Sequence, residues 1–378
     1  MGNIADLFSE LNINTKALTK KKQQTDYKIK YVTEYVRQWV IISSERTDIS
    51  DIVFIDCMCN AGVYYDGDLC TSIEVMQIFS EAAEQHPSKN YVLRLNDIDS
   101  EKIDILKCVI TKLRKKLPNF LIYISNKDVN EYLEQINNST SVFGYGKSVV
   151  LYVDPYDFGT VHIPKVSAIL KKHYCELIFN FFISDYTRNW NTDKDRIAAC
   201  LGGQSIDTKE QLIEYMEKQF KVGKIKLGFS YQFKIITNIE LYQIMFFTPN
   251  KRGLEVLKDA LWKVFNGKFY HRNRSEFEES QMSLFTVQDE RQWLLEMHAA
   301  DARNLLMSQS GRTMTYQEIE LLLIEKSMLM ESQIIKSVLD PLIAAGSIKK
   351  LNLVPTKRNY KKDSYEIGNS NGTKNANI

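Results

Sequence analysis

Four aspartates stand at or just beyond the ends of short apolar runs, where their carboxylates could act on a bound molecule. Asp56, Asp97, Asp128 and Asp154 each follow a run of the kind that forms a buried strand. Because parallel strands end at one edge of their sheet, we expect these side chains to gather there. Carboxylates accept hydrogen bonds from ribose hydroxyls and from amines. The pattern therefore predicts a crevice for a nucleoside-like ligand.

The stretch 53–62, VFIDCMCNAG, is the centre of this pattern. It closes an apolar run on Asp56 and then passes through Cys57 and Asn60 to Gly62. A glycine at such a turn lets the backbone approach a ligand, and an asparagine adopts the left-handed conformation at a modest penalty. Cys57, in contrast, adds a β-carbon where the backbone needs to be bare. A packed strand-to-helix turn that binds no ligand is the alternative interpretation.

The segment Asp154-Pro155-Tyr156 resembles the D-P-P-Y motif of enzymes that methylate the exocyclic amine of adenine or cytosine. The lone pair of such an amine is conjugated into the ring. A side-chain oxygen and a backbone carbonyl that accept its two hydrogens make it a better nucleophile. Asp154 would be the acceptor, and Tyr156 or Phe158 would stack on the base. The second proline of the motif is missing, Asp157 stands where the aromatic is expected, and an ordinary turn is the alternative.

A wider resemblance covers residues 25–367. The segments IDCMCNAGVYYDG, LRLNDID and LYVDPYDFG, the last followed by LIFNF, resemble the three-Cys-motif partner proteins (TcmP) in residue types and spacing. In that family the first turn reads closer to D-G-F-A-G-P-G, so Cys57 and Asn60 replace two glycines here. The resemblance implies a class I methyltransferase fold, S-adenosylmethionine as cofactor, and a partner protein that bears a three-cysteine motif.

The physical needs of an S-adenosylmethionine site predict roles for the residues at the strand ends. Asp97 would accept hydrogen bonds from both ribose hydroxyls, and Asp99 would cap the following helix. Asp128 would contact the adenine amino group, or alternatively cap its own helix, and Asn126 is a weaker candidate for the same pocket. The remaining cofactor-binding candidates are at the first turn: Asp56, Cys57, Asn60 and Gly62.

Two further polar residues are candidates for the substrate pocket. Asn180 lies inside the apolar run LIFNFF, so its amide needs a partner: it either lines the pocket or ties down a neighbouring backbone. Arg188 stands beside Trp190, a pair that suits a base or a phosphate but also a surface cation–π contact. The histidines and cysteines show no metal-ligand spacing, so we expect no metal site.

Strands alternate with helices in the larger part of the chain, and this favours a doubly wound, Rossmann-like α/β sheet of seven strands, of the class I methyltransferase type. An amphipathic helix at 26–42 precedes the sheet, and a capping box at Thr71 and Glu74 is expected to open the helix that ends near Gln85. The last two strands are expected to form a hairpin at the sheet edge. The expected strands are 52–56, 91–96, 120–125, 149–153, 177–183, 231–236 and 241–247.

The remaining elements predict a second domain. Three helices, at 293–306, 315–325 and 332–345, and a hairpin of 348–354 with 365–367 favour a winged helix-turn-helix. The predicted organisation is a polar arm at 1–24, a methyltransferase-like domain at 25–265 with an inserted helical lid at 185–226, a linker at 266–287, the winged helix-turn-helix domain at 288–367 and a disordered tail at 368–378.

The amino-acid composition limits the classes of protein to which this chain can belong. The chain has 378 residues, 44% of them hydrophobic and 25% charged, which is typical of a globular protein with two domains. Its formal charge of +2 gives no overall field that would attract nucleic acid. The six scattered cysteines suit reduced thiols, and neither a signal peptide nor a membrane-spanning run is visible. We expect a cytoplasmic protein.

Two hypotheses of function follow. The first is methyl transfer from S-adenosylmethionine to a nucleic-acid base of DNA or RNA, with the winged helix gripping the substrate through basic residues, or alternatively docking a protein. The second is a catalytically inactive methyltransferase-like adaptor that binds a three-Cys-motif partner in a phage-defence or mobile-element module. A dinucleotide-dependent oxidoreductase is disfavoured because the G-x-G-x-x-G turn is missing. The basic residues are Lys336, Lys349, Lys350, Lys357, Arg358, Lys361 and Lys362.

Overall fold

The computed structural model describes residue 16 and residues 18–183, 186, 192–235, 240–268, 270–271, 287–351 and 363–368. The chain divides into two compact units, Met1–Ala260 with Phe269–His271, and Leu261–Lys268 with Arg272–Ile378. Several expectations lie outside the described residues: Arg188 and Trp190, the turn at 237–238, the basic segment 357–362, most of the 1–24 arm, most of the 266–287 linker and nearly all of the 368–378 tail.

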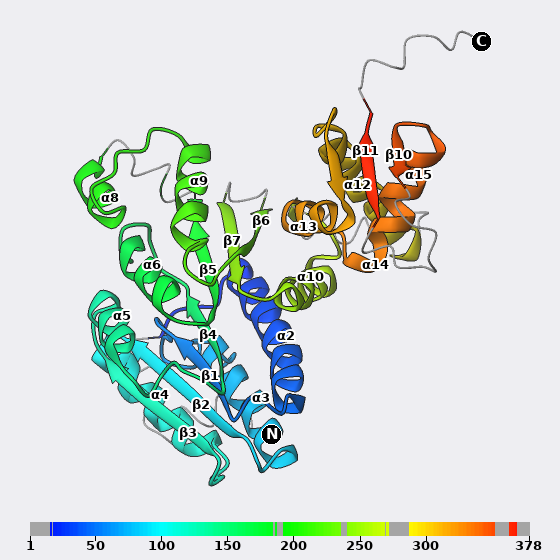
Figure 1. Cartoon of the computed structure of the whole chain (residues 1–378). Coiled ribbons are helices and arrows are strands. Elements are labelled where there is room, and N and C mark those ends of the chain that lie inside the picture. Colours follow the sequence, from blue (N-terminus) through cyan, green and yellow to red (C-terminus); the bar gives the residue numbers. More distant parts are fainter. Residues whose placement is uncertain are drawn as a thin grey trace. The chain divides into compact units, whose positions relative to one another are not determined.

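The first unit is built on a mixed sheet in which five parallel strands carry the predicted apolar runs (Figure 1). β7 runs antiparallel between β5 and β6, and the strand order is β3-β2-β1-β4-β5-β7-β6-β8. The predicted Rossmann-like, class I methyltransferase type of sheet is thereby confirmed. The strands are β1 (Asp51–Asp56), β2 (Asn90–Asp97), β3 (Phe120–Asn126), β4 (Lys147–Val153), β5 (Glu176–Phe182), β6 (Leu227–Ile235), β7 (Glu240–Thr248) and β8 (Tyr270–His271).

The predicted hairpin forms, but it does not make the edge of the sheet. β6 and β7 pair along nine residue positions, and the two-residue strand β8 pairs with β6 on its outer side. β8 was not predicted, because its two residues are too few to show the alternation of a strand.

Helices cover both faces of this sheet. α2 (Gln23–Glu45) and α3 (Thr71–Gln85) pack on one face, whereas α5 (Val129–Asn138), α6 (Ile163–Lys172) and α9 (Lys209–Phe220) pack on the other (Figure 1). Side chains alternate along each strand, so Val53 and Ile55 of β1 join the α5–α6 core while Asp56 points toward the α2 side. Three more helices belong largely to this unit: α4 (Ser100–Leu113), α8 (Lys194–Cys200) and α10 (Lys251–Phe265).

A side chain caps the N-terminus of α4 but not that of α3. Asp99 caps α4 as predicted, because its carboxylate accepts from the backbone N–H groups of Glu101 and Lys102. The capping box predicted at Thr71 is wrong: α3 begins at Thr71, its N-cap is Cys70, and no side chain caps it. Ser72 instead donates its hydroxyl hydrogen to the Cys59 carbonyl, 3.3 Å away, which ties the helix start to the β1 loop.

The second unit contains the three predicted helices and both predicted strands. A short strand β9 precedes the second helix, and the third helix contains a π-helical segment, η2. The three strands form a sheet in the order β10-β11-β9. The elements are α12 (Val287–Met307), β9 (Thr313–Thr315), α13 (Tyr316–Lys326), α14 (Glu331–Ile334), η2 (Ile335–Leu339), α15 (Asp340–Ala344), β10 (Ile348–Leu351) and β11 (Ser364–Ile367).

Across the described residues, no helix is both long enough and apolar enough to cross a bilayer.

Candidate functional site

A pocket of about 430 Å³ lies at the carboxyl ends of β1 and β4. These neighbouring strands are where the strand order of the sheet reverses, which is the usual ligand position in open α/β sheets. Its volume falls within the range of small-molecule sites. The described lining residues are Thr19, Lys20, Lys22, Thr25, Lys28, Asp56, Met58, Cys59, Asn60, Tyr64, Cys70, Thr71, Tyr152, Asp154, Pro155 and Tyr156.

Asp56 forms the acidic floor of this pocket. It is the last residue of β1, is 2% exposed, and accepts a hydrogen bond from the Met58 backbone N–H at 3.2 Å. Burial raises the pKa of the Asp56 carboxyl to about 8, and the negative charges of Asp154 and Asp97 add to the effect. The carboxyl is therefore mostly protonated at neutral pH, and a cation placed beside it would favour its ionised form.

The turn after β1 contains two residues in the left-handed backbone conformation. Asn60 takes the left-handed conformation (φ +58°), as its residue type allows, and its side-chain oxygen accepts from the Ala61 N–H. Gly62 has φ +81°, and a β-carbon there would lie 2.8 Å from Leu106 Cδ1 and 3.0 Å from Ile73 Cγ1. Its backbone conformation and its packing against Ile73 and Leu106 therefore favour glycine here. Gly62, which was predicted to bind the cofactor, is not among the described residues that line the pocket.

Cys57 is not in the pocket, contrary to its assignment as a cofactor-binding residue. Its side chain is fully buried in the core between the sheet and helices α5 and α6. The reason is the alternation of the strand: Cys57 follows Asp56, so it points to the opposite face. The β-carbon that replaces a glycine of the family pattern thus does not fill the site.

Asp97 holds the turn in place. Its Oδ2 accepts from the Asn60 N–H at 2.9 Å and its Oδ1 from the Asp99 N–H at 3.0 Å. Asp97 is not among the described residues that line the pocket. A carboxylate has about four acceptor positions, so about two of them remain for a ligand.

Asp128 is engaged at the start of α5. Its carboxylate accepts from the Asn130 N–H at 2.8 Å and from the Glu131 N–H at 3.4 Å, which is the helix-capping alternative. Nearby, Asn126 donates to the backbone carbonyls of Asp97 and Ile98, both at 2.9 Å. The two hydrogen bonds of Asn126 join the end of β3 to the end of β2.

Asp154 is held by a lysine that the sequence analysis did not single out. Lys28 Nζ, from α2, donates to Asp154 Oδ1 at 2.8 Å and to Oδ2 at 2.9 Å, and the Tyr152 hydroxyl donates to Oδ2 at 3.1 Å. The Lys28 and Asp154 side chains are only 18% and 21% exposed. No sequence signal indicated this pair, because 126 positions separate its members.

A chain of hydrogen bonds continues beneath Asp154. Asn180 donates to the Tyr152 hydroxyl at 3.2 Å and accepts from the Tyr31 hydroxyl. Burial raises the pKa of both tyrosines well above its ordinary value, so both hydroxyls remain donors. Asn180 was expected to line the pocket or to tie down backbone; instead it joins side chains of α2 and β4. The placement of Tyr31 and Tyr152 was not predicted either.

The two aromatic residues that follow Asp154, Tyr156 and Phe158, lie in different environments. Tyr156 lines the pocket, is 63% exposed, and has Lys102 Nζ 5.3 Å from its ring centre. Phe158 is buried, with its ring centre 5.1 Å from that of Phe181 and 5.0 Å from that of Tyr186. Phe158 is therefore a core residue in this structure, and Tyr156 is the ring available to a ligand.

The segment that leads into α2 and the first turns of that helix form the basic wall of the pocket. Lys20, Lys22 and Lys28 line it. The segment is fastened to the β1 turn, since the Tyr65 N–H donates to the Thr19 carbonyl at 2.9 Å and Lys21 pairs with Asp68 at 2.5 Å. The pocket thus presents carboxyl groups on its floor and ammonium groups on one wall.

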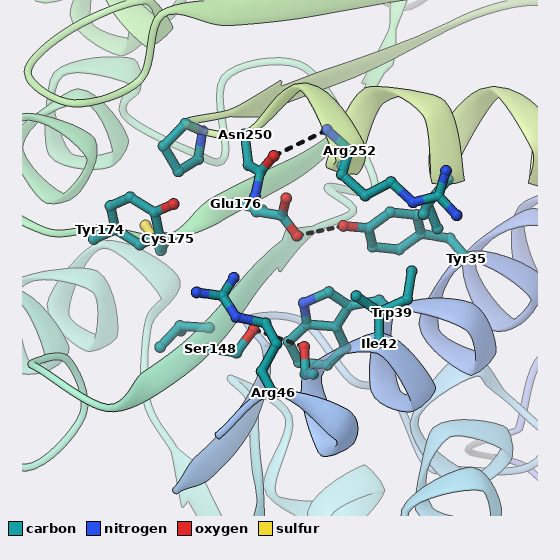
Figure 2. A pocket seen from close by; sticks show the side chains of 15 residues that line it. Tyr35, Trp39, Ile42, Arg46, Ser148, Tyr174, Cys175, Glu176, Asn250 and Arg252 are labelled. Carbon is teal, nitrogen blue, oxygen red and sulfur yellow. Dashed lines mark hydrogen bonds between the residues drawn. The ribbon is translucent and has the colours of Figure 1, made fainter. Parts of the chain in front are cut away.

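A second, smaller cavity of about 60 Å³ lies at the opposite end of the strands (Figure 2). Its central polar group is Glu176, at the start of β5. The carboxyl accepts from the Tyr35 hydroxyl at 2.5 Å and from the Thr248 hydroxyl at 2.6 Å, and burial raises its pKa. The cavity is small, and its central carboxyl is bonded to protein hydroxyls. We therefore interpret this region as a structural contact between α2 and the sheet.

No protein-family model and no curated protein matches the sequence. Among solved structures, a Legionella pneumophila protein of family DUF519 aligns with a TM-score of 0.38 and 8% identity, covering 63% of this chain and 92% of that one. A 16S rRNA (adenine(1408)-N(1))-methyltransferase from Catenulisporales acidiphilia aligns with a TM-score of 0.30 and 9% identity, covering 56% and 90%. Magnesium protoporphyrin IX methyltransferase from Synechocystis, with bound SAH, aligns with a TM-score of 0.29 and 9% identity, covering 57% and 81%. Such low identities and scores say nothing about chemistry.

Proposed function

We propose that this protein is an S-adenosylmethionine-dependent methyltransferase that modifies an exocyclic amine of a nucleic-acid base. The observation that carries the proposal is the pocket at the ends of β1 and β4, which has Asp56 and Asp154 in its lining and lysines along one wall. A buried carboxyl with a raised pKa stabilises a cation that reaches it, and lysines bind carboxylates or phosphates.

The residues present fit the amino-acid end of this cofactor. Asp56 would bind its ammonium group, the lysines of the basic wall, Lys28 among them, would bind its carboxylate, and Asn60 brings the turn after β1 to the pocket lining. Asp97 remains the candidate for the ribose hydroxyls. When bound, the cofactor supplies a methyl group activated on a sulfonium.

The residues at the end of β4 would receive the substrate. Asp154 and the backbone carbonyl of Pro155 would accept the two hydrogens of the amine, and the exposed ring of Tyr156 would stack on the base. Lys102, beside that ring, would contact a phosphate. A positively charged rim around an exposed aromatic ring suits a single-stranded or flipped-out base.

The sequence resemblance extends this proposal to the whole chain. We propose that the protein acts as a three-Cys-motif partner protein, and that its second unit, as a winged helix-turn-helix, contacts DNA, RNA or the partner. The order of helices and strands in that unit supports this assignment.

Calorimetry with S-adenosylhomocysteine and S-adenosylmethionine tests the cofactor. We expect micromolar binding that is lost in Asp97→Ala and weakened in Asp56→Asn. Asp104→Asn is the matched control, because Asp104 is exposed and pairs with Lys107 on the same helix, α4. Transfer of radiolabelled methyl groups to single-stranded oligonucleotides then tests the substrate, with Asp154→Asn as the inactive variant.

A catalytically inactive adaptor is the second candidate. It is favoured by the ion pair with Lys28, which occupies the acceptor oxygens of Asp154. If neither the protein alone nor its complex with a three-Cys-motif protein binds either cofactor form, the methyltransferase proposal fails and the adaptor role remains.

A further inference from the structure

We propose that Lys28 is a cofactor-operated gate: it holds Asp154 in the free protein and moves to the carboxylate of the cofactor's methionine end, which frees Asp154 for the substrate amine. This inference rests on the proposed function. It assigns Lys28 a positioning role and makes the carboxylate a determinant of which nucleosides open the site.

Lys28 and Asp154 form an ion pair that engages both carboxylate oxygens. Lys28 Nζ reaches both oxygens of Asp154, at 2.8 and 2.9 Å, and the Tyr152 hydroxyl takes a further position on Oδ2. Three of the roughly four acceptor positions of a carboxylate are thus filled. Both side chains are largely buried, so solvent screens the pair little.

The substrate amine is a weaker donor to Asp154 than the Lys28 ammonium group. A hydrogen bond between two charged groups is roughly twice as strong as one between neutral groups. The N–H groups of an exocyclic amine are neutral, so they cannot displace the Lys28 ammonium from Asp154. For Asp154 to accept from an amine, Lys28 has to be drawn away by another anion.

The anion that draws Lys28 away is the carboxylate of the ligand. Asp56, the other acid among the described lining residues, would bind the ammonium group of the same cofactor, so it does not serve as the new partner of Lys28. A carboxylate that is part of the ligand would meet Lys28 inside the pocket, because Lys28 is one of the residues that line the pocket.

The Lys28 side chain can move while helix α2 stays in place. Tyr31, one turn further along α2, is buried and bonded to Asn180 of β5, which fixes the helix at this point. Lys28 carries four methylene groups, so its ammonium can change partner without a backbone shift. Binding is therefore ordered: the cofactor first, then the amine.

The test uses two nucleosides that differ at the amino-acid end. S-Adenosylhomocysteine carries the carboxylate, and 5′-methylthioadenosine lacks the whole amino-acid group. We expect Lys28→Met to weaken binding of S-adenosylhomocysteine about tenfold, which is about 1.4 kcal/mol, and to leave 5′-methylthioadenosine unchanged. Lys28→Arg should restore part of the loss. Lys30→Met is the control and should change neither affinity, because Lys30 is an exposed lysine of the same helix that pairs with Asp26 and is not among the described residues that line the pocket.

The outcomes separate this inference from the proposed function. Unchanged 5′-methylthioadenosine binding shows that the pocket of Lys28→Met is folded. If Lys28→Met weakens both ligands equally, or neither, the gate is disproved while the cofactor site stands. If the wild-type protein binds neither ligand, the proposed function fails and the gate fails with it.

Discussion

The Tyr31 hydroxyl on α2 donates to the side-chain oxygen of Asn180 on β5, across 149 positions of the chain, and both residues are buried. This bond lies directly below Tyr152 and Asp154 in the hydrogen-bonded chain. It fixes the helix that carries Lys28 against the strand next to β4. The candidate site therefore depends on how α2 is attached to the sheet.

Tyr31→Phe should destabilise the protein by about 1–3 kcal/mol, because it leaves the buried oxygen of Asn180 without its donor. Urea unfolding measures the loss, and Tyr145→Phe, at a 98% exposed tyrosine, is the control. The double variant Tyr31→Phe with Asn180→Leu should cost less than the sum of the two single changes. Strict additivity would contradict a direct bond.

Binding of a cationic ligand should release a proton from Asp56. In the free protein its pKa is about 8, so the carboxyl is protonated below that pH, and an ammonium beside it favours the ionised form. Affinity for S-adenosylhomocysteine should thus rise as the pH increases toward 8 and level off above it. Calorimetry in buffers of different ionisation enthalpy measures the released proton, and Asp56→Asn should show none.

Glu176 should make stability fall as pH rises. Its folded pKa is raised above the ordinary value of 4.5, so the folded state holds a proton that the unfolded state has already lost. The contribution of Glu176 to the free energy of unfolding is fully present below the ordinary pKa. It decreases as the pH rises toward the pKa of Glu176 in the folded protein. Glu176→Gln cannot ionise, so its melting temperature should fall less between pH 5 and pH 8. An identical slope in both proteins would show that Glu176 ionises freely.

Gly62→Ala should cost about 3 kcal/mol: about 1 kcal/mol for the left-handed backbone and about 2 kcal/mol for the clash with Leu106 and Ile73. Gly203→Ala is the matched control. Gly203 has a similar φ, +85°, but no atom lies within 4 Å of its added β-carbon, so only about 1 kcal/mol is expected. Denaturant midpoints compare the two, and equal losses would argue against close packing of the β1 turn.

Tyr156→Ala should weaken binding of single-stranded oligonucleotides about tenfold, since stacking of a base on an aromatic ring contributes about 1–3 kcal/mol. Tyr145→Ala removes another exposed tyrosine and should have little effect. Fluorescence anisotropy at two salt concentrations checks both variants. Equal affinities for the two variants would remove Tyr156 from the substrate site.

Local sequence signals predicted elements well wherever the physical cause was local. The central strands β1 and β4 were visible because strands buried on both faces are almost wholly apolar. The edge strand β3 was visible from its apolar composition, although alternate side chains of it are exposed. Asp99 was recognisable as a cap because it acts on the residues that follow it. Thr71 looked equally suitable, yet Cys70 is the N-cap of α3 and Ser72 bonds to the β1 turn, a partner that the local pattern does not contain.

The sequence by itself determined the alternating strands and helices, the acids at the strand ends and the glycine of the first turn. These follow from hydrophobic periodicity and backbone conformation, which act between near neighbours. Only the tertiary structure decided that Cys57 points into the core, that Asp97 holds the turn, and that Lys28 reaches Asp154. The pairing of Lys28 with Asp154 arises because the sheet order sets α2 beside β4 and β5, and no short-range pattern encodes a contact over 126 positions.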